Sequence, residues 1–279
     1  MAPTRVLIGN QKGGSGKSTT AANFAAVLAE AGDRVLAVDL DPQAHLGSFL
    51  GANLVDLPEG ARRRVDISDV LEVEPGTAMH SLADAVITSP YHPDIDVVAA
   101  SRQGLQRRIF EINANANEGQ LALSRLLSDE NLAANGLEYD WILLDTAPSI
   151  DNLLRSAMRA VDFVLPVLAP EEAQVEAVQE FLGEIDRTRK LANPDLRDLP
   201  VLLNKIDPNK GKAYVAEMIS LLSAAGVEVF ESWVPHYVAI TRTFSVGPMV
   251  LRSPNSQQAG VLRGAMYDVR DRMLEVHAG

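Results

Sequence analysis

The chain has 279 residues, a formal net charge of −12, 47% hydrophobic residues, 22% charged residues and no cysteine. This composition is ordinary for a globular protein, and the lack of cysteine excludes disulfides, thiolate catalysis and cysteine-held iron–sulfur clusters. Because the balance is acidic, nucleic acid or an acidic membrane would have to bind through a local basic patch. The start, "MAPTRVLIGN", lacks a leader pattern and no apolar run is long enough to span a bilayer, so we expect a cytoplasmic protein.

Short runs rich in Val, Ile and Leu recur along the chain, with helix-like segments between them. Strands that are hydrophobic on both faces predict a parallel sheet covered by helices on each side, which is a doubly wound α/β fold. We expect residues 1–279 to form one domain, with Gly51–Pro93 as the least regular region. The predicted strands are Val6–Gly9, Val35–Leu40, Asp96–Ala100, Trp141–Thr146, Phe163–Ala169, Val201–Ile206 and Val227–Val234.

The stretch "GNQKGGSGKSTT" (Gly9–Thr20) lies directly after the first predicted strand. It ends as the phosphate-binding motif G-x-x-x-x-G-K-[ST] does, although Gln11 stands at the leading glycine position. Glycines let backbone N–H groups turn towards phosphate oxygens, Lys17 would reach the β- and γ-phosphates, and the Ser18 hydroxyl would bind Mg²⁺. The expected nucleotide-binding residues here are Gly13, Gly14, Ser15, Gly16, Lys17, Ser18 and Thr19.

Two segments carry a clear helical pattern. After the loop, apolar residues at 24, 27, 28 and 31 follow helical spacing, and Gly32 is placed to end that helix. Near the end of the chain, one helical face is predicted to carry Leu262, Met266, Val269 and Met273.

Carboxylates follow two of the predicted strands. "LAVDLDPQ" places Asp39 and Asp41 two residues apart, so both can face the crevice where the strands end. "YDWILLDTAPS" carries Asp145 to the tip of an apolar strand, where a carboxylate would support Mg²⁺. The alternative for Asp145 is a helix N-cap.

Later in the chain, "LLNKID" contains the pattern N-K-x-D at Asn204–Asp207, which in GTPases recognises guanine. A four-residue motif has a high false-positive risk, so adenine and guanine both remain open from this pattern alone. The segment that begins "WVPHY" at Trp233 spans the end of the last predicted strand and contains Pro235.

With Lys12 ahead of the loop, the stretch resembles the deviant Walker A motif K-G-G-x-x-K-[ST] of the ParA/MinD family of ATPases. That resemblance implies that Lys12 crosses a dimer interface to the partner's nucleotide phosphates. "DLDPQ" resembles the family's D-x-D-P-Q switch, which implies that Asp41 orients the attacking water and Asp39 supports Mg²⁺. It further implies that Asn204 contacts adenine and that Val234-Pro235 closes the base pocket.

The resemblance implies a ParA-type partition or positioning ATPase that uses ATP and Mg²⁺. Such a protein would form an ATP-dependent homodimer, bind non-specific DNA of the nucleoid, and hydrolyse ATP when a ParB-like adaptor stimulates it. Because the chain ends at "EVHAG" without a basic amphipathic tail, we expect no membrane binding. Because the loop begins at residue 11, we expect no N-terminal helix-turn-helix.

The chain departs from chromosomal partition ATPases at two positions. Where those proteins carry DNA-binding arginines after the Pro, this sequence has His236 and Ala239. The remaining candidates for a basic DNA-binding surface are Lys210, Lys212, Arg242, Arg252, Arg263, Arg270 and Arg272.

Two other functions remain compatible with these motifs. One is a metabolic ATP-dependent ligase of the same fold, similar to dethiobiotin synthetase, with a small-molecule pocket beside the γ-phosphate. The other is a GTP-binding switch, which the pattern "NKID" favours. The switch and Val-Pro segments argue against the ligase.

Overall fold

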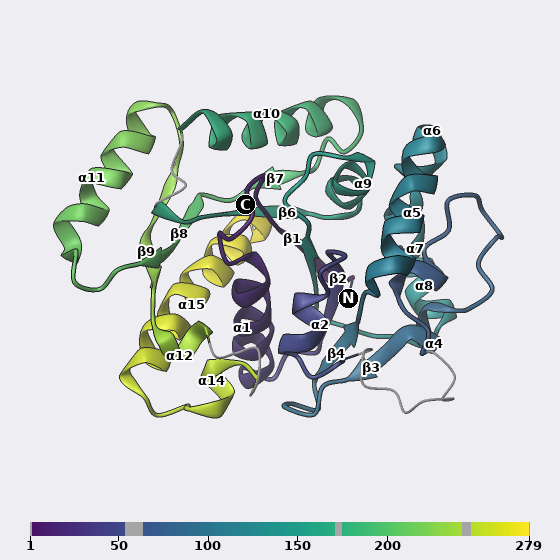
Figure 1. Ribbon diagram of the computed structural model, residues 1–279, viewed down its shortest axis with the longest axis horizontal. Coiled ribbons are helices and arrows are strands. Elements are labelled where there is room, and N and C mark those ends of the chain that lie inside the picture. Colours follow the sequence, from purple (N-terminus) through teal and green to yellow (C-terminus); the bar gives the residue numbers. More distant parts are fainter. Residues whose placement is uncertain (1, 54–63, 171–174, 242–246, 279) are drawn as a thin grey trace.

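The computed structural model describes residues 2–53, 64–170, 175–241 and 247–278. A single sheet of nine described strands has the order β3-β4-β2-β5-β1-β6-β8-β9, with the short β7 paired to β6 (Figure 1). All pairs are parallel except β3 with β4. The strands are β1 (Thr4–Gly9), β2 (Val35–Leu40), β3 (Val86–Thr88), β4 (Ile95–Val98), β5 (Trp141–Thr146), β6 (Phe163–Leu168), β7 (Arg197–Asp198), β8 (Val201–Ile206) and β9 (Val229–Pro235).

Helices cover both faces of this sheet (Figure 1). One face packs against α1 (Lys17–Glu30), α2 (His45–Phe49), α14 (Met249–Arg252) and α15 (Gln257–Ala278). The other face is covered by α3 (Ile67–Val70), α5 (Arg102–Ala114), α7 (Ala122–Leu126), α9 (Asn152–Ala160), α10 (Val175–Leu191) and α11 (Gly211–Ala224). Shorter helices lie in the connections: α4 (Leu82–Ala85), α6 (Ala116–Gly119), α8 (Asp129–Ala134) and α12 (Val238–Thr241).

The central strands are buried on both sides because their side chains alternate between two cores. In β1, Val6 and Ile8 pack on the α1 side, whereas Leu7 packs on the α9 side. Residues alternate in this way along every strand, so a sheet with two covered faces needs a continuous apolar run. The predicted doubly wound α/β fold is confirmed.

Both predicted helical patterns are confirmed. α1 ends at Glu30 with Ala31 as its C-cap, and Gly32 follows with a φ of +94°, in the left-handed region that glycine adopts most readily. Of its predicted apolar face, Phe24, Val27 and Leu28 are fully buried and Ala31 is exposed. The face predicted for the last helix is fully buried in α15 at Leu262, Met266, Val269 and Met273.

The region that the sequence indicates to be irregular, Gly51–Pro93, contains more structure than expected. Its described part includes α3, α4 and β3, and β3 forms an antiparallel edge with β4. β3 has only three half-buried or exposed residues, too few for a recognisable pattern, and the two-residue β7 escaped prediction for the same reason. β9 begins at Val229, two residues later than predicted.

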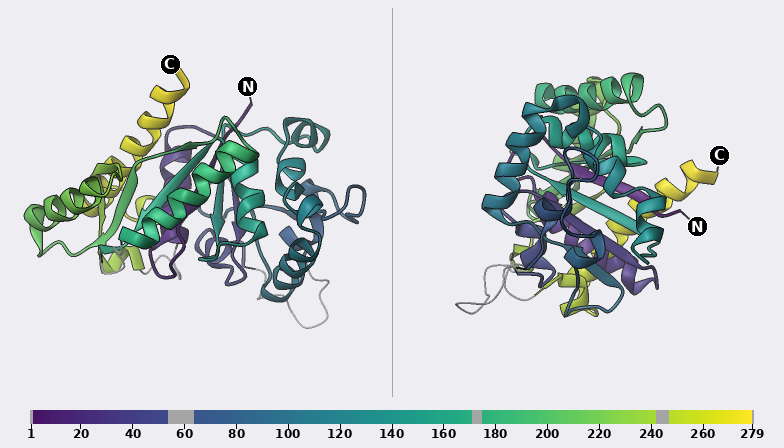
Figure 2. Two further views of the ribbon diagram at one scale, coloured as in Figure 1. Left: turned by 90° about the horizontal axis from the view of Figure 1, so that it is seen from above. Right: turned by 90° about the vertical axis from the view of Figure 1, so that its right-hand side faces the viewer.

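Both ends of the chain lie on the far side of the molecule in Figure 1, as the two turned views of Figure 2 show. The near side is therefore the edge at which the parallel strands end. Loops after β1, β2, β5 and β8 meet at this edge, where ligands of open α/β sheets bind. Across the described ranges, we find no helix with both the length and the apolarity of a membrane span.

Candidate functional site

The loop between β1 and α1 has the backbone of an anion-binding nest. Gly14 and Gly16 have φ of +83° and +88°, so the chain alternates in handedness and its N–H groups can point to one side. Asn10 anchors the start of the loop: its Nδ2 donates to the Val167 carbonyl of β6 at 2.7 Å, and its Oδ1 accepts from the Lys12 N–H at 3.3 Å. The N-terminus of α1 follows at once and adds its positive end.

The two lysines of the loop occupy different places. Lys17, at the first position of α1, is only 6% exposed, and its Nζ donates to the Lys12 carbonyl at 3.4 Å. The cation is thus folded back towards its own loop, and its contact with phosphates stays a prediction. Lys12 is half-buried and lies five residues earlier, at the start of the turn. The two lysines of the loop therefore differ in burial, with Lys17 nearly buried and Lys12 half-buried.

Strand register brings two of the predicted carboxylates together. Asp39 of β2 is the direct register partner of Asp145 of β5, and both are fully buried. The Asp39 carboxylate accepts from the Asp41 N–H at 3.0 Å and from the Gly47 N–H at 2.9 Å. Ser18 and Lys17 lie close enough to Asp145 to act on its charge. The sheet therefore assembles residues from three separate segments at one point.

Because Asp39 and Asp145 are buried side by side, their ionised forms are unfavourable unless a cation lies next to them. Burial raises the pKa of Asp39 to about 7, against the opposing effect of the Gly47 and Asp41 N–H groups. Burial, followed by the charge of Asp39, raises the pKa of Asp145 well above its ordinary value, although the Ser18 hydroxyl and the Lys17 ammonium lower it in part. A divalent cation placed among these groups would offset the like charges.

Buried polar atoms test whether magnesium and phosphate fit here. In the described part of the chain, several lack a hydrogen-bond partner at this site: Gln11 Oε1, Ser15 Oγ, both carboxylate oxygens of Asp145 and Thr146 Oγ1. Buried polar atoms are nearly always paired, so such a group of unpaired oxygens beside an anion-binding loop fits a hydrated metal with phosphates.

Magnesium commonly uses one or two protein carboxylates together with waters and substrate phosphates. Within the described ranges, no three His, Cys, Asp or Glu side chains form a group that could hold a metal by themselves. Ser18, Asp39 and Asp145 are the donors that would complete such a partly hydrated site. The N-cap alternative for Asp145 is wrong, because Asp151 caps α9 by accepting from the Leu154 N–H at 2.9 Å.

Asp41 lies just beyond the end of β2 and is nearly buried. Its Oδ1 accepts from the Gln43 N–H at 2.8 Å, and its carbonyl accepts from the Ala44 N–H at 2.8 Å. Ala44 has a φ of +55°, an unusual value for a residue with a side chain. The segment predicted to be a switch is therefore a strained, internally bonded turn beside the carboxylates.

The residues predicted to hold the base also lie together. Asn204 and Pro235 line a narrow pocket of about 30 Å³, room for about one water molecule, whose other walls are Gly16, Thr19, Lys205, His236, Tyr237 and Ile240. The Asn204 Nδ2 donates to the Ser15 carbonyl at 2.9 Å and to Thr20 Oγ1 at 3.3 Å. In addition to its predicted contact with adenine, Asn204 thus supports the phosphate loop.

Guanine recognition through N-K-x-D would require Asp207 at this pocket. Asp207 does not line it, and its Oδ1 accepts instead from the N–H and side-chain amide of Asn209 at 2.9 and 3.0 Å. Contributors to the site that have no role in the sequence prediction include Asn10, Gly47 and Lys205. Asn10 and Lys205 stand inside recognised motifs, whereas nothing local distinguishes Gly47.

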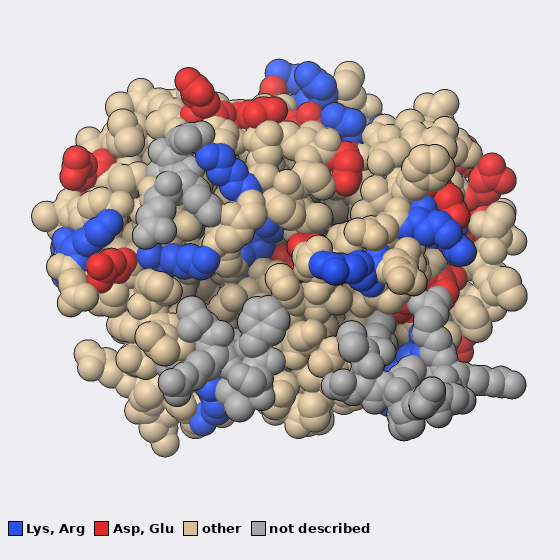
Figure 3. All heavy atoms as spheres, in the orientation of Figure 1, with Lys and Arg blue, Asp and Glu red and all other residues tan. Residues whose placement is uncertain are grey.

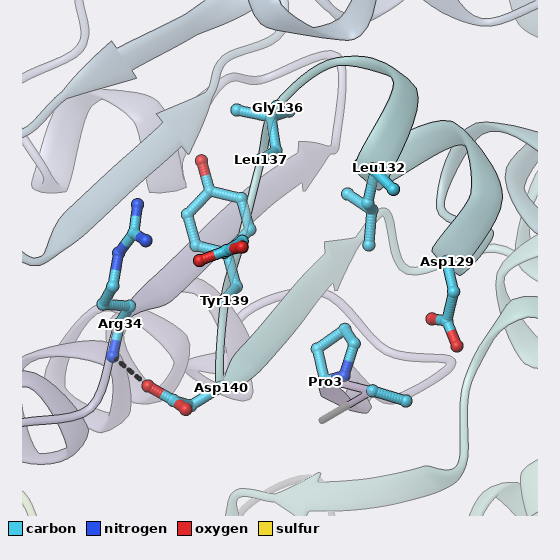
Figure 4. Close-up of a pocket in the computed structure, with 11 residues that line it drawn as sticks. Pro3, Arg34, Asp129, Leu132, Gly136, Leu137, Tyr139 and Asp140 are labelled. Carbon is cyan, nitrogen blue, oxygen red and sulfur yellow. Dashed lines mark hydrogen bonds between the residues drawn. The ribbon is translucent and has the colours of Figure 1, made fainter.

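A much larger hollow on the described surface lies elsewhere. About 590 Å³ in volume, it is found at the opposite ends of the strands, beside the starts of β2 and β5 (Figure 4). There the Arg34 N–H donates to Asp140 at 2.7 Å, and the Arg34 guanidinium lies 5.6 Å from the centre of the Tyr139 ring. Asp129, Glu138 and Asp140 also line this hollow, and carboxylates repel phosphate. Chemistry rather than volume therefore identifies the nucleotide site.

The predicted basic residues are dispersed. Lys210 and Lys212 are exposed, and Arg252 is half-buried. All three arginines of α15 lie beside carboxylates: Arg263 is 2.7 Å from Glu30, Arg270 is 3.4 Å from Asp33 and Arg272 is 3.6 Å from Glu275. Arg242 lies outside the described residues.

Comparison with known proteins agrees with this geometry. Residues 4–198 match the family described as an AAA domain. The chain is 30% identical over 274 residues to the chromosome-partitioning ATPase Soj of Thermus thermophilus, with 97% of each chain covered. It is 33% identical over 251 residues to the chromosome partitioning protein ParA of Caulobacter vibrioides, which covers 89% of this chain and 87% of that protein.

Among solved structures, cobyrinic acid a,c-diamide synthase from Mycobacterium smegmatis with bound ADP and magnesium is similar in fold, with a TM-score of 0.73. It is 25% identical and covers 94% of this chain and 91% of that one. The two partition ATPases are more similar in sequence, at 30% and 33% identity against 25% for the synthase, which favours partition over the ligase and GTP-switch alternatives. The chain therefore belongs to the ParA/Soj family of partition ATPases.

Proposed function

We propose that two copies of this chain close around two ATP–Mg²⁺ molecules and act as a switch that positions DNA or another cargo. The 279 residues would work as one domain, since strands from both halves of the chain share one sheet. Each subunit would hold its own nucleotide with the loop from Gly13 to Thr19. Lys12 of each subunit would then reach the phosphates held by its partner.

The observation that carries this proposal is the separation of the two lysines. Lys17 is buried inside its own loop, where it can serve only its own nucleotide. Lys12 stands at the start of the turn and is half-buried, so it is more exposed than Lys17. On the face of the molecule seen in Figure 3, Lys and Arg side chains also extend across the middle. ATP phosphates bound between two copies would offset the repulsion between these cations and stabilise the dimer.

Hydrolysis would follow from the same residues. Mg²⁺ held through Ser18, Asp39 and Asp145 would neutralise charge on the β- and γ-phosphates, together with Lys17 and the partner's lysine. Asp41 would orient the water that attacks the γ-phosphate. Because Asp41 belongs to a strained turn, hydrolysis and release of phosphate can change the conformation of that segment.

The ATP-bound dimer would bind nucleoid DNA without sequence preference, and a ParB-like adaptor would stimulate hydrolysis and release. The protein would act in the cytoplasm. Its affinity for DNA would come from contacts with the phosphates and would fall as the salt concentration rises. Lys210 and Lys212 support this step because they are exposed. Arg263 is a weaker candidate for a DNA contact because it already pairs with Glu30.

Substitution of Lys12 tests the dimer. Lys12→Ala should bind ATP as a monomer but fail to dimerise or hydrolyse it, whereas Lys17→Ala should lose nucleotide binding itself. Size-exclusion chromatography with light scattering and a phosphate-release assay measure both properties. A Lys12→Ala protein that dimerises and hydrolyses ATP as the wild type does would refute the proposal.

DNA binding is tested with ATP, ADP and no nucleotide at two salt concentrations. We expect binding only with ATP, and weaker binding at the higher salt. A Lys210→Ala/Lys212→Ala protein should retain the ATP-dependent dimer and lose affinity for DNA. Equal binding in all three nucleotide states would contradict the ATP-regulated cycle.

A further inference from the structure

Lys205, the residue after Asn204 in β8, has an unusual backbone. With a φ of +57°, it is one of two described non-glycine residues in the left-handed region, and the other, Ala44, also adjoins the site. Its conformation is held from one side, since the Asn204 Oδ1 accepts the Lys205 N–H at 2.8 Å. Residues with side chains adopt such a conformation rarely, and mostly where surrounding contacts impose it.

The Lys205 side chain reaches a distant part of the chain. Its Nζ donates to the carbonyl of Gly14, 191 residues away in sequence. On the way it passes over Gly16, since a Cβ added to that glycine would lie 3.7 Å from the Lys205 Cε. Beside it, the Asn204 Nδ2 binds the Ser15 carbonyl at 2.9 Å. Two consecutive residues of β8 thus hold two consecutive carbonyls of the phosphate loop.

These contacts determine where the N–H groups of the loop point. In a planar trans peptide the carbonyl and the following N–H point in opposite directions. A Gly14 carbonyl drawn towards Lys205 therefore turns the Ser15 N–H to the other side, and the bound Ser15 carbonyl does the same for the Gly16 N–H. A free glycine-rich loop could instead turn a carbonyl towards the phosphates, which would repel them.

We propose that Lys205 is a positioning residue of the phosphate loop. It acts through the Gly14 carbonyl, which it holds away from the anion site, so that phosphate affinity depends on a cation outside the Walker motif. This inference rests on the proposed function only in requiring that nucleotide binds at this loop. Because the held peptides form the cradle for the α- and β-phosphates, ATP and ADP should depend on Lys205 equally.

Three substitutions separate the cation from the backbone. Lys205→Ala removes the cation and keeps the strained φ, Lys205→Gly removes the cation and relieves the strain, and Lys205→Arg keeps a charged donor. An exposed lysine of α10 that pairs with Asp186 at 2.6 Å supplies the control, Lys190→Ala. Affinity for Mg²⁺–ADP and Mg²⁺–ATP is measured by calorimetry, and unfolding in urea without nucleotide is followed in parallel.

We expect Lys205→Ala and Lys205→Gly to lower the affinity for both nucleotides by about three- to tenfold. This is the range for losing one charge-assisted hydrogen bond that is exposed to solvent. Lys205→Arg should restore most of the affinity, and Lys190→Ala should bind as the wild type does. Lys205→Gly should be at least as stable as Lys205→Ala in urea, because glycine relieves the strained φ. Comparison of its urea unfolding with that of the wild type separates weaker binding from poor folding.

Because Lys205 also lines the base pocket, a ligand without a base completes the test. Inorganic tripolyphosphate, measured by competition against a fluorescent ADP analogue, should lose affinity by the same factor as ADP. A loss confined to nucleotides, or a Lys205→Gly protein that binds ADP as tightly as the wild type, would overturn the inference and leave the proposed function intact. A wild-type protein that binds no nucleotide would overturn both.

Discussion

Adding one methyl group at the start of α1 gives the sharpest test of how the loop and β8 fit together. Gly16 has a φ of +88°, and a Cβ built on it would lie 2.3 Å from the Asn204 Nδ2. Gly32, at the other end of the same helix, has a similar φ of +94° but nothing within 4 Å of its added Cβ. Gly16→Ala and Gly32→Ala therefore share the backbone strain and differ in the steric contact.

The two costs can be worked out separately. A left-handed conformation costs an L-residue about 1–2 kcal/mol, so Gly32→Ala should lower the free energy of unfolding by about that amount. In Gly16→Ala, the Asn204 amide must also move, which breaks its hydrogen bond to the buried Ser15 carbonyl. An unsatisfied buried group costs about 1–3 kcal/mol, so the total should reach about 2–5 kcal/mol.

Urea unfolding without nucleotide measures these losses, and calorimetry with Mg²⁺–ADP measures binding. Gly16→Ala should lower the affinity for ADP by about tenfold or more, because the substitution adds a free-energy cost of about 1.4 kcal/mol or more to the ADP-bound conformation of the loop. Gly32→Ala should leave the affinity unchanged. Combining Gly16→Ala with Asn204→Ala removes the steric contact, so the two losses of stability should be clearly non-additive. Equal losses for both glycine variants, with unchanged ADP affinity, would refute the packing argument.

Three further predictions concern other parts of the chain. Asp41→Ala should trap an ATP-bound dimer and slow phosphate release about a hundredfold or more, and unchanged turnover would contradict its role. Because the pKa of Asp39 is raised to about 7 in the folded protein, its contribution to stability is complete below about pH 4 and is lost as pH rises through 7. Without magnesium, unfolding in urea should therefore become easier by about 2 kcal/mol between pH 5 and 8; Asp39→Asn should flatten this slope, and an unaltered slope would exclude Asp39 as its source. Arg155→Ala should cost about 3 kcal/mol in urea unfolding, because Arg155 donates at 2.7 Å to the nearly buried Glu184; a loss below about 1 kcal/mol, typical of an exposed ion pair, would show that Glu184 is not isolated by burial.

The sequence by itself determined the features that depend on neighbouring residues. The phosphate loop was predictable because its glycines, its lysines and the strand-to-helix change all lie within a dozen residues. The sheet with two covered faces followed from apolar runs, and the places of Asp39, Asp41 and Asp145 followed from the ends of those runs. Such patterns report local geometry, and the structure reproduces them.

Only the tertiary structure decided which of these pieces meet. The order β2-β5-β1 makes Asp39 and Asp145 direct neighbours, and their mutual burial produces the raised pKa values. The position of β8 two strands from β1 brings Asn204 and Lys205 onto carbonyls of a loop almost two hundred residues earlier. Periodicity along the chain shows that a strand is buried but carries no information on which strand lies beside it. That choice is made by the packing of the whole sheet and its helices, and it gives the site its electrostatics.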